Sequence, residues 1–234
     1  MDITNKSTVD SWSEFTSDDL TKFGEDGDSA RRDLIDPVIF KIAGKVKGKK
    51  VLDAGCGNGY LARKLAHQGA VVTGIEPATS LYEYCLEKEE IDSLGITYIK
   101  NSLDDLNYIG EFDIAFVINV FMDIPDYFKS LENCVSSLKS GGEIIISMLH
   151  PAFPGSEDNW KALGHVKIQE YFDVKPKKQK YGHIFVRPIS TYLNDLIGLG
   201  CEVKEFIEPR LPGDADESRN KHVPQFLIIK ARKN

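Results

Sequence analysis

From Lys50 onward, short apolar runs rich in β-branched residues alternate with segments whose apolar residues recur at helical spacing. The apolar runs predict strands at residues 51–53, 71–75, 97–100, 112–118 and 143–148. The segments between them predict helices at residues 60–67, 81–91 and 127–138, with Gly69 and Gly141 as stop signals. Strands that alternate with helices build βαβ units, so we expect a parallel sheet.

Two further strands are predicted near the end of the chain, at residues 202–208 and 225–230. The loop between them contains Pro and Gly and is too short for a crossover helix, so the two strands should form an antiparallel hairpin. The complete pattern predicts an α/β fold: a doubly wound, mostly parallel seven-stranded sheet with an antiparallel C-terminal hairpin and helices on both faces.

Two segments do not follow this alternation. Residues 28–42 indicate a helix with Pro37 inside it, preceded by the loop 23–27, and this arm should pack over a sheet edge or over a ligand. Residues 150–187 contain several Pro and Gly residues among aromatic ones, and long insertions of this kind usually serve function. We therefore expect one domain over residues 1–234, made of an N-terminal arm (1–45), a core (46–149), an insertion or lid (150–187) and a C-terminal helix with the hairpin (188–234).

Composition and charge narrow the classes of function. The formal net charge of −7 argues against a nucleic-acid partner, which clustered Lys and Arg would bind. The chain shows neither a basic leader nor an apolar run of about 20 residues, so we expect a cytoplasmic protein without a membrane span. The four cysteines form no Cys-x-x-Cys pair and should be reduced, buried thiols.

The strongest motif is the segment 51–61, Val-Leu-Asp-Ala-Gly-Cys-Gly-Asn-Gly-Tyr-Leu. It predicts a strand that ends in an acidic residue, then Gly-x-Gly-x-Gly, then a helix, and such glycines allow a ligand to approach the backbone closely. A dinucleotide fingerprint reads Gly-x-Gly-x-x-Gly and receives a pyrophosphate. Here the third glycine comes one residue earlier, and Asp53 would repel a pyrophosphate, so a cationic ligand fits better.

Glu76 follows the second predicted strand, where an acidic side chain can accept hydrogen bonds from both ribose hydroxyls of a nucleoside. With the glycine motif, this position resembles the class I S-adenosylmethionine-dependent methyltransferases, small-molecule type. Later segments extend the resemblance: residues 118–123 match the stretch beneath the cofactor, and residues 138–142 match the Leu-Lys-Pro-Gly-Gly turn.

The resemblance implies S-adenosylmethionine as cofactor and assigns its contacts to four places in the chain. These are the glycine loop and its acid, the second acid, the segment after strand three and the segment after strand four: Asp53, Gly55, Cys56, Gly57, Gly59, Glu76, Pro77, Ser102, Leu103, Asn119 and Val120. At Ser102 this chain departs from the family, which has Asp there for the adenine amine, whereas the backbone amide of Leu103 remains available. A guanidinium from Arg31 or Arg32 is a candidate clamp for the cofactor carboxylate, against the alternative of a solvated helix face.

Two residues are candidate general bases. His150 follows the fifth strand, and its imidazole could deprotonate an acceptor or only shape the loop there. Asp123 could serve as base or could cap a helix that begins near Pro125. For His165 and His183, and for the lysines at 175, 177, 178 and 180, ordinary solvation is the leading interpretation.

Aromatic residues gather in the arm and the insertion, where they could form a water-excluding lid or pack into separate cores: Trp12, Phe15, Phe23, Phe153, Trp160, Tyr171, Phe172 and Tyr181. The sequence thus predicts methyl transfer to a small-molecule acceptor by in-line displacement, with no metal because no ligand cluster shows metal spacing. A catalytically silent adenosyl-binding regulatory protein and a nicotinamide-dependent reductase are the alternatives. The acceptor atom and the oligomeric state, a homodimer included, stay open.

Overall fold

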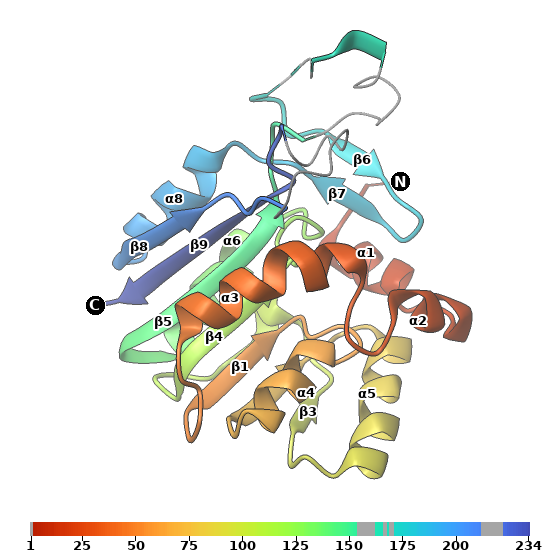
Figure 1. The fold of residues 1–234 in the computed structure, drawn as a ribbon, viewed down its shortest axis with the longest axis vertical. Coiled ribbons are helices and arrows are strands. Elements are labelled where there is room, and N and C mark those ends of the chain that lie inside the picture. Colours follow the sequence, from red (N-terminus) through yellow and green to blue (C-terminus); the bar gives the residue numbers. More distant parts are fainter. Residues whose placement is uncertain (1, 154–161, 166–167, 169–170, 212–221) are drawn as a thin grey trace.

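The computed structural model describes residues 2–153, 162–165, 168, 171–211 and 222–234. A seven-stranded sheet with the strand order β3-β2-β1-β4-β5-β9-β8 forms its centre (Figure 1). The strands are β1 (Lys50–Ala54), β2 (Val71–Ile75), β3 (Thr97–Ile99), β4 (Phe112–Ile118), β5 (Leu138–Leu149), β8 (Cys201–Ile207) and β9 (Phe226–Lys233). β1 to β5 pair in parallel, and β9 pairs antiparallel with both β5 and β8. The predicted fold class is therefore confirmed.

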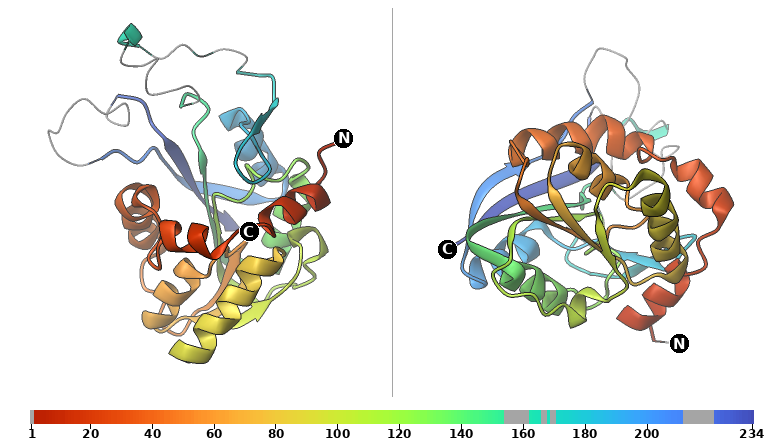
Figure 2. Two further views of the ribbon diagram at one scale, coloured as in Figure 1. Left: turned by 90° about the vertical axis from the view of Figure 1, so that its right-hand side faces the viewer. Right: turned by 90° about the horizontal axis from the view of Figure 1, so that it is seen from below.

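Helices cover both faces of the sheet. They are α3 (Asp36–Ala43), α4 (Tyr60–His67) and α5 (Thr79–Asp92) on one face and α6 (Phe128–Ser137) and α8 (Ile189–Gly198) on the other. Along β4, Ile114 and Phe116 pack toward the first face, whereas Ala115 and Val117 pack toward the second. This alternation follows from the two-residue period of a strand, and burial on both faces explains why the central strands are almost wholly apolar. The edge-on view shows α3 and α8 on opposite sides of the sheet (Figure 2).

The start of β5 differs from the prediction. We expected a helix to Leu138, a glycine turn, and a strand only from residue 143, but α6 ends at Ser137 and β5 already begins at Leu138, opposite Phe112. The pairing shifts register between Phe112 and Ile114, and Gly141 within this stretch has φ of 77°. A bulge tolerates a left-handed glycine, so the residues expected as a free turn belong to an irregular strand.

The N-terminal arm contains more helix than the sequence indicated. Before α3 lie α1 (Asn5–Trp12), α2 (Ser17–Phe23) and a π-helical turn, η1 (Arg31–Ile35). α1 and α2 each begin with a capping box, from Thr4 to Ser7 and from Thr16 to Asp19, and this signal was available in the sequence. Pro37 lies in the first turn of α3, where a missing N–H is tolerated, so the expected helix over residues 28–42 forms with a π-turn before the proline.

The described part of the insertion contains a hairpin that we did not predict, β6 (Pro176–Lys178) with β7 (His183–Phe185). Figure 1 shows this hairpin next to α1 and α2. Asp19 of α2 contacts both Lys180 and Tyr181 of the hairpin turn, and the Tyr181 ring lies 5.8 Å from that of Trp12. Two segments about 160 residues apart in the sequence therefore meet at the carboxyl edge of the sheet.

All four cysteines are buried and free, as predicted. Among the residues described, no helix is both long and apolar enough to cross a membrane.

Candidate cofactor and acceptor site

The glycine loop follows β1 and is tied to β2. Gly55, Gly57 and Gly59 have φ angles of 73°, 56° and 74°, a region that L-residues with side chains adopt rarely. The amides of Gly55 and Cys56 both donate to the carbonyl of Ile75, at 2.9 Å. At Gly55 a Cβ atom would lie 2.6 Å from Cγ2 of Val120, so only glycine allows this loop to pack against the loop that follows β4.

Two buried carboxylates flank the glycine loop. Glu76 accepts hydrogen bonds from the amides of Gly57 (2.9 Å) and Ala78 (2.8 Å), and each oxygen keeps a further lone pair for a ligand. Asp53 is 2% exposed, and its Oδ2 has no hydrogen-bond partner among the described residues. Burial raises the pKa of each carboxyl group to about 7. An orphaned buried oxygen next to open space is what a ligand with a hydrogen-bond donor or a positive charge would satisfy.

A cavity of about 710 Å³ runs from the glycine loop to the loop after β4. Ten of the predicted site residues line it: Arg31, Gly55, Gly57, Glu76, Pro77, Ser102, Leu103, Asn119, Val120 and Asp123. Asp53 and Cys56 line a side pocket of about 50 Å³ that shares Arg31, Gly55 and Gly57 with the main cavity. Gly59 lines neither; a Cβ there would lie 2.6 Å from the Tyr98 hydroxyl oxygen, so this glycine permits close packing beneath the loop.

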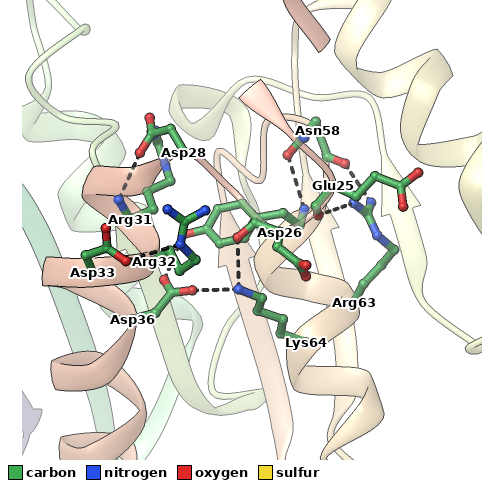
Figure 3. Close-up of polar contacts among 11 residues, drawn as sticks. Glu25, Asp26, Asp28, Arg31, Arg32, Asp33, Asp36, Asn58, Arg63 and Lys64 are labelled. Atoms are coloured by element: carbon green, nitrogen blue, oxygen red, sulfur yellow. Dashed lines mark hydrogen bonds and ion pairs between the residues drawn. The ribbon is translucent and has the colours of Figure 1, made fainter. Parts of the chain in front are cut away.

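The arm presents Arg31 to the cavity. Asp28 caps the start of the helical segment by accepting from the Arg31 amide (2.8 Å) and also pairs with its guanidinium (2.6 Å; Figure 3). The guanidinium lies 4.5 Å from the centre of the Phe23 ring. Arg32 instead pairs with Asp33 at the surface, so only the first arginine of the pair faces the cavity.

The arm is also joined to helix α4, as Figure 3 shows. Arg63 donates to the carbonyls of Asn58 (2.7 Å) and Glu25 (3.1 Å), and Lys64 pairs with Asp36 at 2.9 Å. Arg63 is 8% exposed and binds carbonyls of both the glycine loop and the arm. Polar contacts therefore hold Arg31 and the glycine loop in one arrangement.

The segment after β3 shows a residue that the sequence analysis missed. Ser102 is the N-cap of the short 3₁₀ turn η2 (Leu103–Asp105), where its hydroxyl accepts from the Asp104 amide at 3.3 Å. Asp104 also lines the cavity, and Asn5 of α1 donates to its carboxylate at 2.6 Å. The carboxylate absent at 102 is thus present two residues later, a displacement that comparison with the family's motif position alone does not find.

Asp123 projects into the cavity from the segment between β4 and α6. Its amide donates to the carbonyl of Val120 at 2.8 Å, which closes a turn. Burial raises the pKa of its carboxyl group to about 8, and the positive charge of Arg31 opposes part of this rise. The capping alternative was wrong: α6 begins at Phe128, and its N-cap is Tyr127.

His150 lies outside both cavities. Its Nδ1 accepts from the amide of Ala152 at 3.0 Å, and its Nε2 lies 2.9 Å from a carboxylate oxygen of Glu208. Burial lowers the pKa of the imidazole, and Glu208 opposes this. Because Nδ1 accepts, it carries no proton and is already engaged, and this geometry favours the loop-shaping alternative over a role as base.

The aromatic residues of the arm and the insertion lie in different environments. Trp12, Phe15, Phe23, Phe153 and Tyr181 line the cavity, whereas Phe172 is 82% exposed and contacts Tyr171. Trp160 lies outside the described residues. His165 and His183 do not line the cavity, but two of the insertion lysines do, Lys177 and Lys180.

Other cavity residues had no signal in the sequence pattern. They come from α1, from the loop after β4 and from the strands β5, β7 and β9: Val9, Ile124, Leu149, Ile184 and Phe226. Their apolar character is ordinary for core residues, so only the three-dimensional structure assigns them to the site. In the described ranges, no group of three or more His, Cys, Asp or Glu residues is arranged to hold a metal ion.

Comparisons with known proteins agree with this geometry. Residues 52–146 match the family described as "Methyltransferase domain". A ubiquinone biosynthesis O-methyltransferase of Coxiella burnetii (strain RSA 331 / Henzerling II) is 32% identical over 161 residues, which is 66% of this chain and 66% of that protein. The alignment thus spans just under two thirds of the relative's length.

Two solved structures are also similar. An S-adenosylmethionine-dependent methyltransferase from Mesorhizobium loti has a TM-score of 0.76 and 25% identity, over 90% of this chain and 100% of that one. The 1,6-didemethyltoxoflavin-N1-methyltransferase of Burkholderia thailandensis, solved with S-adenosylhomocysteine, has a TM-score of 0.61 and 16% identity, over 85% of this chain and 76% of that one. The latter likeness concerns the fold. Together with the glycine loop, Glu76 and the sheet order, these matches show that residues 52–146 form a methyltransferase domain and that the chain is similar, in fold and in cofactor-loop sequence, to the class I S-adenosylmethionine-dependent methyltransferases.

Proposed function

We propose that this protein transfers the methyl group of S-adenosylmethionine to a hydroxyl group of a small-molecule acceptor. The observation that carries this proposal is the single cavity that joins the glycine loop and Glu76 to the carboxyl group of Asp123. One end of this cavity suits an adenosyl ligand and the other suits a second reactant, so a donor and an acceptor would be held next to each other.

The residues present fit the cofactor. Glu76 would accept hydrogen bonds from the ribose hydroxyls, and Asp53, with its unpartnered oxygen, would receive positive charge. Arg31 uses one of its five N–H donors for the Asp28 side chain, which leaves others for a carboxylate. Ser102 and Leu103 would lie against the adenine, as the resemblance implies.

Asp123 would act as general base. When bound, S-adenosylmethionine supplies a methyl group that its sulfonium already activates. The protein therefore has to place the acceptor oxygen and remove its proton, and a carboxylate with a pKa of about 8 is a stronger base than an ordinary one. Met122, Phe153 and Ile184 give the cavity apolar walls that suit a ring and exclude water. The name of the Coxiella relative, an O-methyltransferase, supports a hydroxyl acceptor.

The first experiment is titration calorimetry with S-adenosylmethionine, S-adenosylhomocysteine and NADH on the wild type and on Asp53→Asn, Glu76→Gln and Glu87→Gln. We expect micromolar binding of both adenosyl ligands and no binding of NADH. Each of the two site variants should lose about 2 kcal/mol, which is about 30-fold in affinity, whereas the control at the exposed Glu87 should match the wild type.

The second experiment supplies methyl-labelled S-adenosylmethionine with a panel of catechols, phenols and amines and identifies products that have gained one CH₂. Transfer to hydroxyl groups, retained in the presence of a chelator, is the expected result. Adenosyl binding without transfer to any acceptor would favour a silent regulatory protein. Tight binding of NADH instead would favour the reductase.

A further inference from the structure

Arg187 is a buried cation that donates to backbone carbonyls. The residue lies just after β7 in the sequence and is 5% exposed. In the part of the chain that the structure describes, no carboxylate pairs with it, and its donors go to backbone carbonyls instead. A buried charge that is not neutralised is costly, so an arrangement of this kind calls for a compensating role.

The carbonyls that Arg187 binds surround one short segment. Nη1 donates to the carbonyl of Phe121 at 2.9 Å, and Nη2 donates to those of Ile124 and Pro125, each at 2.7 Å. The guanidinium also lies 4.5 Å from the centre of the Tyr127 ring. These contacts hold the segment between β4 and α6, residues 119–127, on both sides of residue 123; we call this segment the acceptor loop.

The acceptor loop has no regular secondary structure of its own, and Met122, Asp123 and Ile124 line the cavity from it. Arg187 also joins it to the hairpin, because Nη1 is 3.4 Å from the Phe185 carbonyl and the Phe185 amide donates to the Met122 carbonyl at 2.7 Å. A loop without internal ladder bonds depends on such external donors for a fixed shape.

We propose that Arg187 is a positioning residue for methyl transfer: by binding the carbonyls of the acceptor loop, it keeps the Asp123 carboxyl group inside the cavity, where the acceptor would bind. This assignment rests on the proposed function. Arginine suits the task better than lysine, because its planar fork reaches several carbonyls at once, whereas an ammonium group binds around one point.

The ionisation state of Asp123 provides a readout of this role. The Asp123 side chain is partly buried where it lines the cavity, and desolvation raises its pKa to about 8. The charged or titratable groups that face it are Arg31 from η1 and Tyr192 from α8. If the loop relaxed and water reached the carboxyl group, the pKa would fall. Loss of a nearby positive charge would by itself raise the pKa, so the direction of the change separates repositioning from simple charge removal.

The test uses the full chain as wild type, Arg187→Lys and Arg187→Gln, with ¹³C NMR titration of Asp123, assigned through Asp123→Asn. We expect the pKa of Asp123 to fall by at least about one unit in both variants. Hydrogen exchange at the amide of Asp123 should quicken at least about tenfold. Affinity for S-adenosylhomocysteine, measured by calorimetry, should change less than about threefold, since Arg187 touches none of the glycine loop.

Arg63→Lys is the matched control. Arg63 is also buried and also binds carbonyls, but on the glycine loop and the arm. It should give the opposite result: at least about tenfold weaker binding of S-adenosylhomocysteine with an unchanged titration of Asp123.

An unchanged titration and unchanged exchange in both folded Arg187 variants would overturn the proposal. If neither variant folds, hydrogen exchange in the wild-type protein is the test. Rapid exchange of the Asp123 amide there would show that the acceptor loop is not held and would also overturn the proposal. The proposed function fails separately, through absence of adenosyl binding in the wild type, and such a result leaves the loop measurement intact.

Discussion

The glycine loop and the acceptor loop lie at the same edge of the sheet, and each is bound by a buried arginine that donates to backbone carbonyls. They differ in where that arginine comes from. Arg63 is five residues from the carbonyl of Asn58, whereas Arg187 is 66 residues from that of Phe121. The arginine of the cofactor side therefore has one near partner in the sequence, besides the Glu25 carbonyl 38 residues away, whereas all of the acceptor-loop carbonyls that Arg187 binds are more than 60 residues away.

The backbone conformations show the same difference. Three of the residues from 55 to 59 have left-handed φ angles and all three are glycines. In the acceptor loop the single left-handed residue is Asn119, with φ of 58°, and its side chain accepts from the Ser147 hydroxyl at 3.0 Å. Local residue choice sets the first loop, and distant partners set the second.

The largest expected effect comes from Gly55→Ala, which affects both loops together. The alanine would have to adopt φ of 73°, and its Cβ would lie 2.6 Å from Val120. We therefore expect the free energy of unfolding to drop by about 2–4 kcal/mol and adenosyl binding to be lost. Urea unfolding and calorimetry measure the two effects. Gly57→Ala is the control, because no described residue lies within 4 Å of the Cβ that it would add, and only backbone strain of about 1 kcal/mol remains. Equal destabilisation by both variants would contradict the contact between the loops.

The next effect separates the loops. Asp123→Asn removes the proposed base from the acceptor loop, so we expect methyl transfer to fall by at least about 100-fold while S-adenosylhomocysteine binds within about threefold of the wild type. In the wild type the rate should rise with pH up to about 8, because the carboxylate form is the base. A pH profile that Asp123→Asn leaves unaltered would assign the base elsewhere.

A smaller effect concerns stability in the absence of ligand. The pKa values of Asp53 and Glu76 are about 7 and that of Asp123 is about 8 in the folded protein, against about 4 when unfolded. The folded state thus binds more protons than the unfolded state between these pH limits. The contribution of these three groups to the free energy of unfolding should therefore be complete below pH 4 and should be lost as the pH rises through 7 to 8. Each carboxyl group should account for about 1–3 kcal/mol of this decline, a value kept small because cavity water screens the charges.

Urea unfolding at pH 5 and pH 8.5 measures this decline. Glu76→Gln should reduce the slope between about pH 4 and 7, whereas Asp123→Asn should reduce it up to about pH 8, so the decline between pH 7 and 8 reports on Asp123. Stability that rises over the same range in the wild type would show that the three carboxylates are not protonated in the folded state.

The smallest effect is expected at His150. His150→Gln removes an imidazole ring that does not line the cavity, so the rate of methyl transfer and the adenosyl affinity should each change less than about threefold. The same assays serve as the measurement. A loss comparable to that of Asp123→Asn would restore the histidine as base and would place the reacting group nearer β5 than the acceptor loop.

The predictability of the fold follows the same division. The bounds of β2, β4 and α4 agree with those predicted, because buried parallel strands and an amphipathic helix have strong periodic signals. β6 and β7 have three residues each and are exposed or only partly buried except at Phe185, so no pattern marks them. α1 and α2 are short, and only their capping boxes at Thr4 and Thr16 identify them.

Within the candidate site, motif spacing located Asp53, Gly57 and Glu76, because backbone geometry alone brings the ends of neighbouring parallel strands together. It did not locate Asp104 or the cavity residues of α1, and it left two roles open for His150, of which the hydrogen bonds favour loop shaping. Side-chain direction in loops depends on tertiary contacts, so sequence spacing does not determine it.

The contact between α2 and the hairpin turn has a consequence for folding kinetics. Asp19 meets Lys180 and Tyr181 across 161 and 162 positions of sequence, so this closure carries a large loop entropy and should form after the sheet has assembled. Because Trp12 and Tyr181 then complete the cavity wall, competence to bind ligand should appear later in refolding than β-structure does. A fluorescent adenosyl analogue added during refolding would time the last step of the pathway rather than its nucleus.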